Sequence, residues 1–183
     1  MDNQDIMQEF KIIFAGSMGA GKTTAIKALS DKEVVSTDVV NSDKKAHNKL
    51  LTTVGIDYGQ IILPPDTKVG LYGTPGQERF ELVWRVVTEG ALGAIVLVDS
   101  SMPKAVKELP YYVDYFHKHK MNSIVVGITH CDLEHSYLTL AESFKILEAR
   151  DFKFPIFEVD ARKRDDVLLL VETLIASIEA EIN

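Results

Sequence analysis

The chain has 183 residues, the usual length of one domain with a sizeable core, and we expect residues 1–183 to form a single domain. Its composition, with 46% hydrophobic and 26% charged residues and no biased tract, is that of an ordinary globular protein rather than a low-complexity chain. The formal net charge of −7 argues against nucleic acid as a main partner, because a phosphate backbone favours a basic face.

Hydrophobic periodicity predicts strands that alternate with helices. The predicted strands cover residues 9–15, 54–63, 67–72, 91–98, 124–129 and 155–159, and the predicted helices cover residues 22–29, 77–88, 103–119, 138–149 and 165–181. A Pro-Pro-Asp turn at residues 64–66 joins the second and third strands into an antiparallel hairpin. This order predicts an α/β fold with a six-stranded, mostly parallel sheet, one antiparallel strand, and helices on both faces.

One long segment, residues 30–51, is polar and has no clear period. A stretch of that length without regular structure is uncommon inside a domain and usually has a function. We interpret residues 31–52 as an insertion that forms either a helix or a partner-binding element.

The stretch after the first strand predicts a phosphate site. Residues 16–23, Gly-Ser-Met-Gly-Ala-Gly-Lys-Thr, match G-x-x-x-x-G-K-[ST] in every required position. The glycines let successive backbone N–H groups point inward, and the positive end of the next helix favours an anion. Lys22 is expected to reach the β- and γ-phosphates of a nucleotide, and the Thr23 hydroxyl to hold Mg²⁺. The alternative is a glycine-rich turn that only joins a strand to a helix.

Residues 73–80, Gly-Thr-Pro-Gly-Gln-Glu-Arg-Phe, together with this loop resemble the Ras superfamily of small GTPases, and the resemblance covers essentially the whole chain. The similarity is greatest to Rab- and Arf-like proteins and to the MglA-like and conservon-type prokaryotic GTPases. The resemblance implies a P-loop NTPase (small G-protein) fold, GTP and GDP as ligands, Mg²⁺ as cofactor, and a GTPase of low intrinsic rate. It also implies regulatory and effector proteins as partners, with a roadblock-type (LC7) protein as the first expectation.

The resemblance assigns roles in hydrolysis to three side chains. Thr53 is similar to the switch I threonine, whose hydroxyl binds Mg²⁺ and whose N–H binds the γ-phosphate, although a β-branched residue at a strand start is an alternative explanation. Gln77 would orient the attacking water, and Lys22 would stabilise the developing charge. The backbone N–H of Gly76 would bind the γ-phosphate.

Two residues depart from the family pattern. Gly73 stands where most members have an aspartate that holds Mg²⁺ through water, and its loss should weaken metal affinity roughly 10–100-fold. Asp99 is a conceivable replacement. Met18 is larger than the small residue of many relatives and would crowd the catalytic glutamine.

The base is expected to lie beyond the strand at residues 124–129. Residues 129–132, Thr-His-Cys-Asp, resemble the family's base-reading motif Asn-Lys-x-Asp. The resemblance implies that the two carboxylate oxygens of Asp132 accept from guanine N1–H and the 2-amino group. It also implies that Thr129 supplies part of the hydrogen bonding of the usual asparagine and that His130 stacks on the base in place of the lysine. Asp-Ala-Arg at residues 160–162 resembles the third recognition loop, in which the alanine N–H reaches guanine O6 and the arginine covers the base. The predicted nucleotide-binding residues are Gly16, Ser17, Gly19, Ala20, Gly21, Lys22, Thr23, Thr24, Gly76, Thr129, His130, Asp132, Asp160, Ala161 and Arg162, with Thr23 and Thr53 as metal ligands.

Cys131 is the only cysteine, so no internal disulfide is expected and a reducing compartment is the simplest assumption. The sequence shows no secretory leader, no apolar run of membrane-spanning length and no lipid-acceptor motif. We therefore expect a cytoplasmic protein without a direct membrane anchor.

These residues predict a guanine-nucleotide-binding switch that hydrolyses GTP slowly with Mg²⁺ and is regulated by protein partners. Because of Gly73 and Met18, a nucleotide-dependent protein-binding module with little or no hydrolysis is the alternative. An ATP-using kinase-type protein fits poorly, since the glutamine motif and Asp132 would have no role. Trp84 and the other apolar residues of the helix predicted over residues 77–88 form either an effector face or, as is the simpler explanation for most of them, part of the core. Trp84 is the one to test, because exposed aromatic residues concentrate binding energy.

Overall fold

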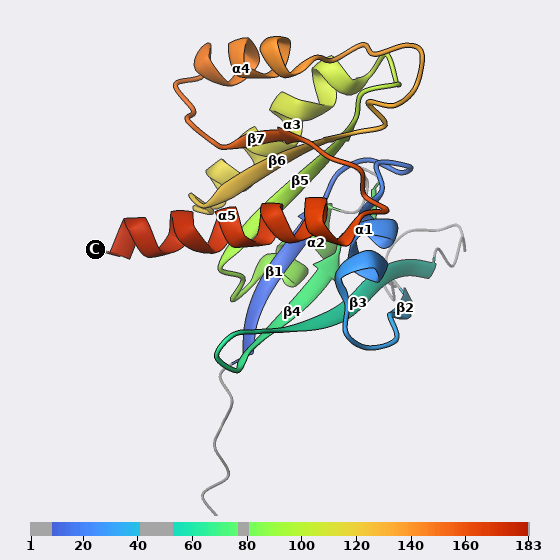
Figure 1. Cartoon of the computed structure of the whole chain (residues 1–183), viewed down its shortest axis with the longest axis vertical. Coiled ribbons are helices and arrows are strands. Elements are labelled where there is room, and N and C mark those ends of the chain that lie inside the picture. The colour runs from blue at the N-terminus through green and yellow to red at the C-terminus, as the bar shows by residue number, and fades with distance from the viewer. Residues whose placement is uncertain (1–8, 41–52, 77–80, 183) are drawn as a thin grey trace, which may run out of the picture.

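A seven-stranded sheet lies at the centre of the computed structural model, which describes residues 9–40, 53–76 and 81–182 (Figure 1). The strands are β1 (Glu9–Ala15), β2 (Val35–Val40), β3 (Thr53–Leu63), β4 (Thr67–Gly73), β5 (Gly93–Asp99), β6 (Ile124–Thr129) and β7 (Ile156–Glu158). Their order across the sheet is β2-β3-β4-β1-β5-β6-β7. Only β3 pairs antiparallel with its neighbours, so one strand runs against the others, as the predicted hairpin requires.

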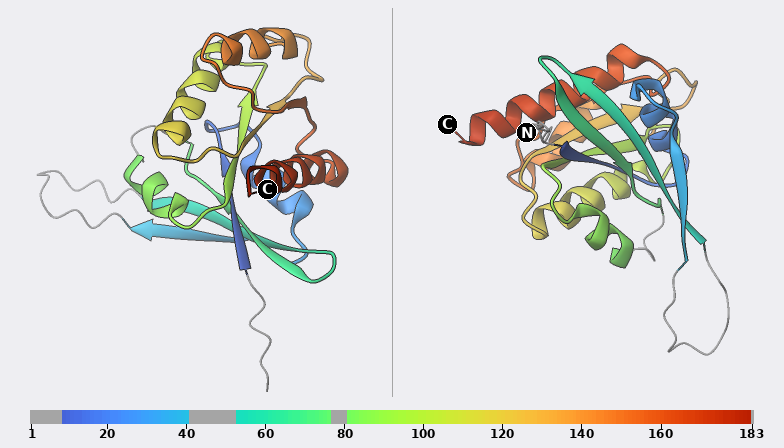
Figure 2. Two further views of the ribbon diagram at one scale, coloured as in Figure 1. Left: turned by 90° about the vertical axis from the view of Figure 1, so that its left-hand side faces the viewer. Right: turned by 90° about the horizontal axis from the view of Figure 1, so that it is seen from below.

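Helices cover both faces of this sheet (Figure 2). They are α1 (Lys22–Leu29), α2 (Glu81–Thr88), α3 (Ala105–Lys118), α4 (Leu140–Glu148) and α5 (Arg164–Ile182). Successive side chains of a strand point to opposite faces, and β1 shows this directly. Ile12 and Phe14 are buried in the core shared with α1 and α5, whereas Ile13 and Ala15 are buried in the core shared with α2, α3 and α4. The α/β class and the two helical layers are confirmed.

Strand β2 corrects the predicted strand count and part of the predicted insertion. Residues 35–40 are neither a helix nor irregular, because they pair antiparallel with β3, with Ser36 opposite Asp57. This strand is at the edge of the sheet, and its described side chains, Val35 and Ser36, are exposed. The rest of the predicted insertion, residues 41–52, lies outside the described residues.

Several helix starts also differ from the predicted ones: α4 begins at Leu140 and α5 at Arg164, against predicted starts at residues 138 and 165. α3 begins at Ala105, so Pro103 lies in the turn before the helix rather than at its first position. α2 begins at Glu81, and residues 77–80 of the predicted helix lie outside the described part of the chain. In the ranges that the structure describes, no helix combines the length and apolar character needed to cross a bilayer.

The sheet topology places a crevice at the carboxyl end of β1. β1 pairs with β4 on one side and with β5 on the other. The strands β2 to β4 therefore lie on one side of β1, and the strands β5 to β7 lie on the other. Ligands of open α/β sheets bind in the crevice outside the carboxyl ends of the strands at such a point. The loop over residues 16–21, which joins β1 to α1, lies there, as do the chain segments that follow β4, β5 and β6.

Candidate functional site

The loop between β1 and α1 has a backbone that only glycine adopts readily. Gly16, Gly19 and Gly21 have φ values of 136°, 90° and 95°, in the left-handed region. A Cβ on Gly16 would also stand 2.1 Å from the carbonyl oxygen of Leu97 in β5. The observed conformation of the loop therefore requires the glycines that were predicted to form a phosphate loop.

Lys22 at the start of α1 places a buried ammonium under this loop. Its side chain donates to the carbonyl oxygens of Gly16 at 2.8 Å and Ser17 at 2.7 Å. Burial lowers the pKa of Lys22 to about 8, and the negative charge of Asp57 opposes that shift. The Ser17 hydroxyl is buried and has no hydrogen-bond partner among the described residues. A buried cation and an unsatisfied hydroxyl at one loop are features of a binding site for a polar ligand.

The segment after β4 closes over the loop from the other side. The N–H of Thr74 donates to the carbonyl of Phe14 at 2.9 Å, which directs the chain across β1. The N–H of Met18 then donates to the carbonyl of Gly76 at 3.2 Å. A Cβ on Gly76 would lie 2.3 Å from the Met18 nitrogen, so this glycine is needed for the close approach of two backbones. The Met18 side chain itself is 71% exposed.

Together these segments line a pocket of about 300 Å³. Its lining residues are Met18, Gly19, Gly21, Lys22, Thr23, Thr24, Gly55, Asp57, Thr74, Pro75 and Gly76. The Asp57 carboxylate accepts from the hydroxyl of Thr23 through one oxygen and from the Ser36 hydroxyl, at 2.5 Å, through the other. Sequence analysis missed this acid. The signal that reveals it is the register of the β3–β4 hairpin, which places it opposite Gly73.

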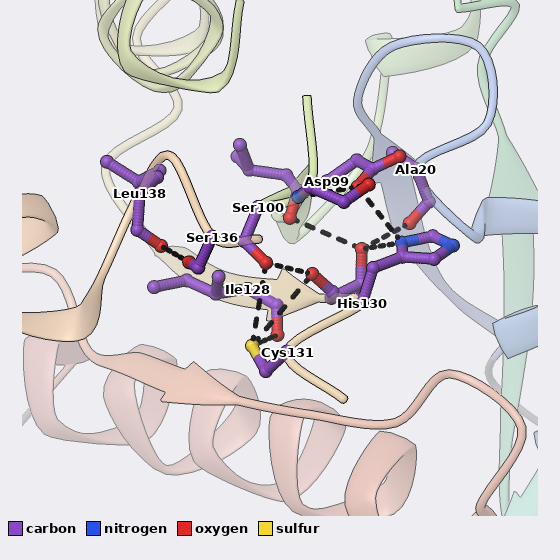
Figure 3. Close-up of polar contacts among 11 residues, drawn as sticks. Ala20, Asp99, Ser100, Ile128, His130, Cys131, Ser136 and Leu138 are labelled. Carbon is purple, nitrogen blue, oxygen red and sulfur yellow. Dashed lines mark hydrogen bonds and ion pairs between the residues drawn. The ribbon is translucent and has the colours of Figure 1, made fainter. Parts of the chain in front are cut away.

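Asp99, the acid considered as a replacement at Gly73, is used elsewhere. Its carboxylate accepts from the N–H and hydroxyl of Ser101, at 3.0 and 2.6 Å. It also lies 3.4 Å from Nδ1 of His130 (Figure 3). These contacts place Asp99 on the side of the loop toward β6, away from the Thr23 hydroxyl that Asp57 contacts.

Thr129 at the end of β6 ties the phosphate loop to the sheet. Its buried hydroxyl lies 3.0 Å from the carbonyl of Ala20 and 3.2 Å from that of Val98. His130 follows with a φ of 60°, and its ring turns toward Asp99, with Nδ1 3.0 Å from the Thr129 hydroxyl (Figure 3). The ring of His130 thus lies beside the loop.

Arg162 joins two acids at the rim. Its guanidinium donates to both oxygens of Asp160, at 2.7 and 2.8 Å, and to Oδ2 of Asp132 at 2.9 Å. The hydrogen bonds from Arg162 lower the pKa of Asp160 to about 2 and, in turn, raise the pKa of Arg162. The Asp132 side chain is 58% exposed, so its carboxylate is also open to a ligand.

A second pocket, of about 260 Å³, lies beside the first. It is lined by Gly21, Thr24, Thr129, His130, Asp132, Leu133, Asp160, Ala161 and Arg162. Gly21 and Thr24 line both pockets, so the two halves form one groove around the start of α1. Of the predicted phosphate-binding residues of the loop, Gly19, Gly21, Lys22, Thr23 and Thr24 line the first half. The predicted base-binding residues line the second half.

Some predicted residues do not line this groove in the described structure, among them Gly16, Ser17 and Ala20 of the loop. Gln77 and the Thr53 side chain lie outside the described residues, and only the backbone of Thr53 is placed, at the start of β3. Of the two explanations for Trp84, the structure supports core packing and not an effector face, because its ring is fully buried and packs against Tyr112 and Tyr115 of α3. Its indole N–H donates to the carbonyl of Pro75 at 2.7 Å, so α2 is anchored to the segment over the phosphate loop.

Comparison with known proteins agrees with this geometry. A sequence model of the Ras family matches residues 11–180. Ras-related protein Rab-18 of Lymnaea stagnalis is 26% identical over 97% of this chain and 84% of its own length, and Ras-related protein Rab-3D of Homo sapiens is 26% identical over 99% and 79%. A protein of Methanocaldococcus jannaschii whose name says that it is uncharacterised is 37% identical over 51% of this chain, which is 53% of its own length. The predicted resemblance is confirmed, and the chain belongs to the Ras family of small GTPases.

Proposed function

We propose that the chain binds GTP and GDP with Mg²⁺ and hydrolyses GTP slowly to GDP and phosphate, as a switch read by protein partners. The observation that carries the proposal is the groove around the start of α1. Its first half holds a left-handed glycine loop over a buried ammonium, and its second half holds an exposed carboxylate. Phosphates suit the first half and a purine edge suits the second.

The phosphate half supports specific roles for the residues of the chain. The N–H groups of Met18 and Ala20 donate to carbonyls within the protein, so the anionic oxygens fall to the other N–H groups of the loop and to those of the first turn of α1. The Lys22 ammonium supplies a full charge beside them. The Thr23 hydroxyl, with Thr53 from the start of β3, holds Mg²⁺, a hard cation that prefers oxygen ligands. When bound, Mg²⁺ neutralises charge on the β- and γ-phosphates. The oxygen-rich lining at Thr23 fits such an ion.

The base half supports selection of guanine by Asp132. A carboxylate has about four acceptor positions, and Arg162 occupies one of them, so both oxygens still have room for guanine N1–H and the 2-amino group. Adenine has no matching donors and would leave the acid unpaired. Arg162 holds this acid in place and lies over the pocket where a base would sit.

Competition between GTP and ATP tests the base assignment. We expect the wild-type protein to prefer GTP, and Asp132→Ala to lose most of that preference. Glu134→Ala, which removes an exposed acid two residues away, is the matched control and should retain it. An equal affinity of the wild-type protein for GTP and ATP, or an unchanged preference in Asp132→Ala, would contradict the proposal.

Hydrolysis is assigned to water oriented by Gln77, with an expected intrinsic rate on the order of 10⁻⁴–10⁻² s⁻¹. One observation favours the alternative of a binding module with little hydrolysis. The N–H of Met18 donates to the carbonyl of Gly76, so Met18, the residue expected to crowd the catalytic glutamine, lies next to the residue that precedes Gln77. Single-turnover decay of bound GTP distinguishes the two. The switch predicts slower decay in Gln77→Ala than in the wild type, whereas the module predicts equal decay in both.

We place the protein in the cytoplasm because a single cysteine suits a reducing compartment. By the resemblance alone, we expect its regulators to include a roadblock-type protein. A switch requires that such a partner binds one nucleotide state better than the other. Pull-down with a candidate regulator should therefore differ between protein loaded with GDP and protein loaded with a non-hydrolysable GTP analogue. Equal capture in both states would exclude that regulator as a partner of the switch.

A further inference from the structure

The hairpin register places an acid beside the glycine that replaces the expected acid. β3 and β4 pair antiparallel from Leu63 opposite Thr67 to Asp57 opposite Gly73. Residues that are directly opposite in an antiparallel pair have their side chains on the same face of the sheet. A side chain at position 73 and the side chain of Asp57 would therefore compete for one space.

The contacts around Gly73 show how closely these two positions coincide. A Cβ built on Gly73 would lie 3.2 Å from the Cβ of Asp57 and 3.5 Å from its Oδ2. The third neighbour of this Cβ is Ile26 in α1, at 3.0 Å. A carboxylate at position 73 would thus overlap with the Asp57 carboxylate, and the absence of a side chain at Gly73 makes room for it.

The Asp57 carboxylate also contacts the hydroxyl group that the loop motif assigns to Mg²⁺. Its Oδ2 accepts from the hydroxyl of Thr23, the residue assigned to Mg²⁺ by the loop motif, and both residues line the phosphate half of the groove with Lys22. Ser36 of β2 donates to Oδ1 at 2.5 Å, which orients the carboxylate from the other side. A negative oxygen next to a hydroxyl in an oxygen-lined pocket is a suitable donor set for Mg²⁺.

We propose that Asp57 is the carboxylate that holds Mg²⁺ in this protein, supplied from β3 in place of the acid missing at Gly73 at the end of β4. This assignment rests on the proposed nucleotide function, because the ion is expected to bind together with the phosphates. It replaces the expectation of weakened metal affinity with one of a relocated ligand. It also gives β2 a role, since its Ser36 positions that ligand.

A purely structural role for Asp57 makes a different prediction. If the side chain only accepts hydrogen bonds from Thr23 and Ser36, an amide oxygen can replace one carboxylate oxygen, and Asp57→Asn should change little. If the charge holds Mg²⁺, Asp57→Asn should weaken the metal site by about 10–100-fold, the usual cost of losing such a partner. Asp66→Asn, in the turn at the far end of the same hairpin, is the matched control.

The experiment measures the release rate of a fluorescent GDP analogue as a function of Mg²⁺ concentration, with EDTA as the zero point. We expect Asp57→Asn to release GDP like the wild type in EDTA but to need about 10–100-fold more Mg²⁺ to slow release. Asp66→Asn should follow the wild-type curve. The exchanged variant Asp57→Gly/Gly73→Asp, which moves the carboxylate to the opposite strand, should recover most of the Mg²⁺ sensitivity.

Two results would overturn the assignment while the nucleotide function stands. They are superimposable Mg²⁺ curves for Asp57→Asn and the wild type, or an exchanged variant that melts like the wild type yet responds to Mg²⁺ like Asp57→Asn. Absence of GDP binding by the wild type itself, with and without Mg²⁺, would instead refute the proposed function together with the metal assignment. The circular dichroism melting curve of each variant verifies that it is folded.

Discussion

The buried ammonium of Lys22 should make the stability of the nucleotide-free protein rise with pH. Burial lowers the pKa of Lys22 to about 8, from an ordinary value of 10.5, and the negative charge of Asp57 only partly opposes this. Between these two values the unfolded chain holds the proton and the folded chain has released it. Because the unfolded state then binds more protons, the free energy of unfolding increases as the pH rises through this window.

The size of the effect follows from the two pKa values. A difference between about 8 and 10.5, at about 1.4 kcal/mol per pH unit, corresponds to about 3 kcal/mol. The protein should gain about that much stability from Lys22 between pH 7 and pH 10.5. Below pH 8 the charged ammonium is retained at a cost in stability, which a phosphate at the loop would offset, because an anion favours the charged form.

Urea denaturation of nucleotide-free protein at several pH values measures this gain. Other groups also titrate in this range, so the relevant quantity is the difference in unfolding free energy between the wild type and Lys22→Met at each pH. Lys27→Met, which removes a surface ammonium from the same helix, should keep the full wild-type rise. A difference between the wild type and Lys22→Met that stays constant from pH 7 to pH 10.5 would refute the reasoning.

Three further predictions concern the loop, the core and the rim. Gly16→Ala should destabilise the fold by about 2 kcal/mol or more and abolish GDP binding, because the new Cβ meets a β5 carbonyl at a φ of 136°; thermal melting and GDP titration test this, and wild-type values would contradict it. Trp84→Phe should cost about 1–3 kcal/mol, because the Pro75 carbonyl loses its indole donor, and an unchanged urea midpoint would argue against that bond. Arg162→Ala should raise the pKa of Asp160 from about 2 toward its ordinary 3.8, as followed by carboxyl NMR, and an unshifted titration would show that another group holds it low.

Much of the fold follows from local sequence signals. β5 and β6 are buried along their whole lengths, so they are uninterrupted apolar runs that need no knowledge of their neighbours to be found. The phosphate loop is equally local, because its left-handed backbone requires glycine at fixed spacings. The place of the site, outside the carboxyl ends of the strands, then follows from the general behaviour of parallel α/β sheets.

The features that sequence analysis missed depend on pairing between distant residues. β2 is an edge strand whose described side chains, Val35 and Ser36, are exposed. It exists because β3 offers it hydrogen bonds, so its own sequence has no clear strand pattern. Sequence analysis missed Asp57 for a related reason. Its place beside the phosphate loop becomes evident only when the hairpin register sets it opposite Gly73. The choice between core packing and an effector face for Trp84 depended on the position of α3, because helical periodicity alone does not show how far α3 covers this residue.

The central claim is that the loop between β1 and α1 and the carboxylate of Asp132 together hold a guanine nucleotide. The most direct test is to denature the purified protein and identify by chromatography and mass spectrometry the nucleotide that it releases. The account predicts GDP or GTP, one per chain, and none from Lys22→Ala. A folded wild-type protein that releases no purine nucleotide, and binds none when GDP and Mg²⁺ are added, would contradict it.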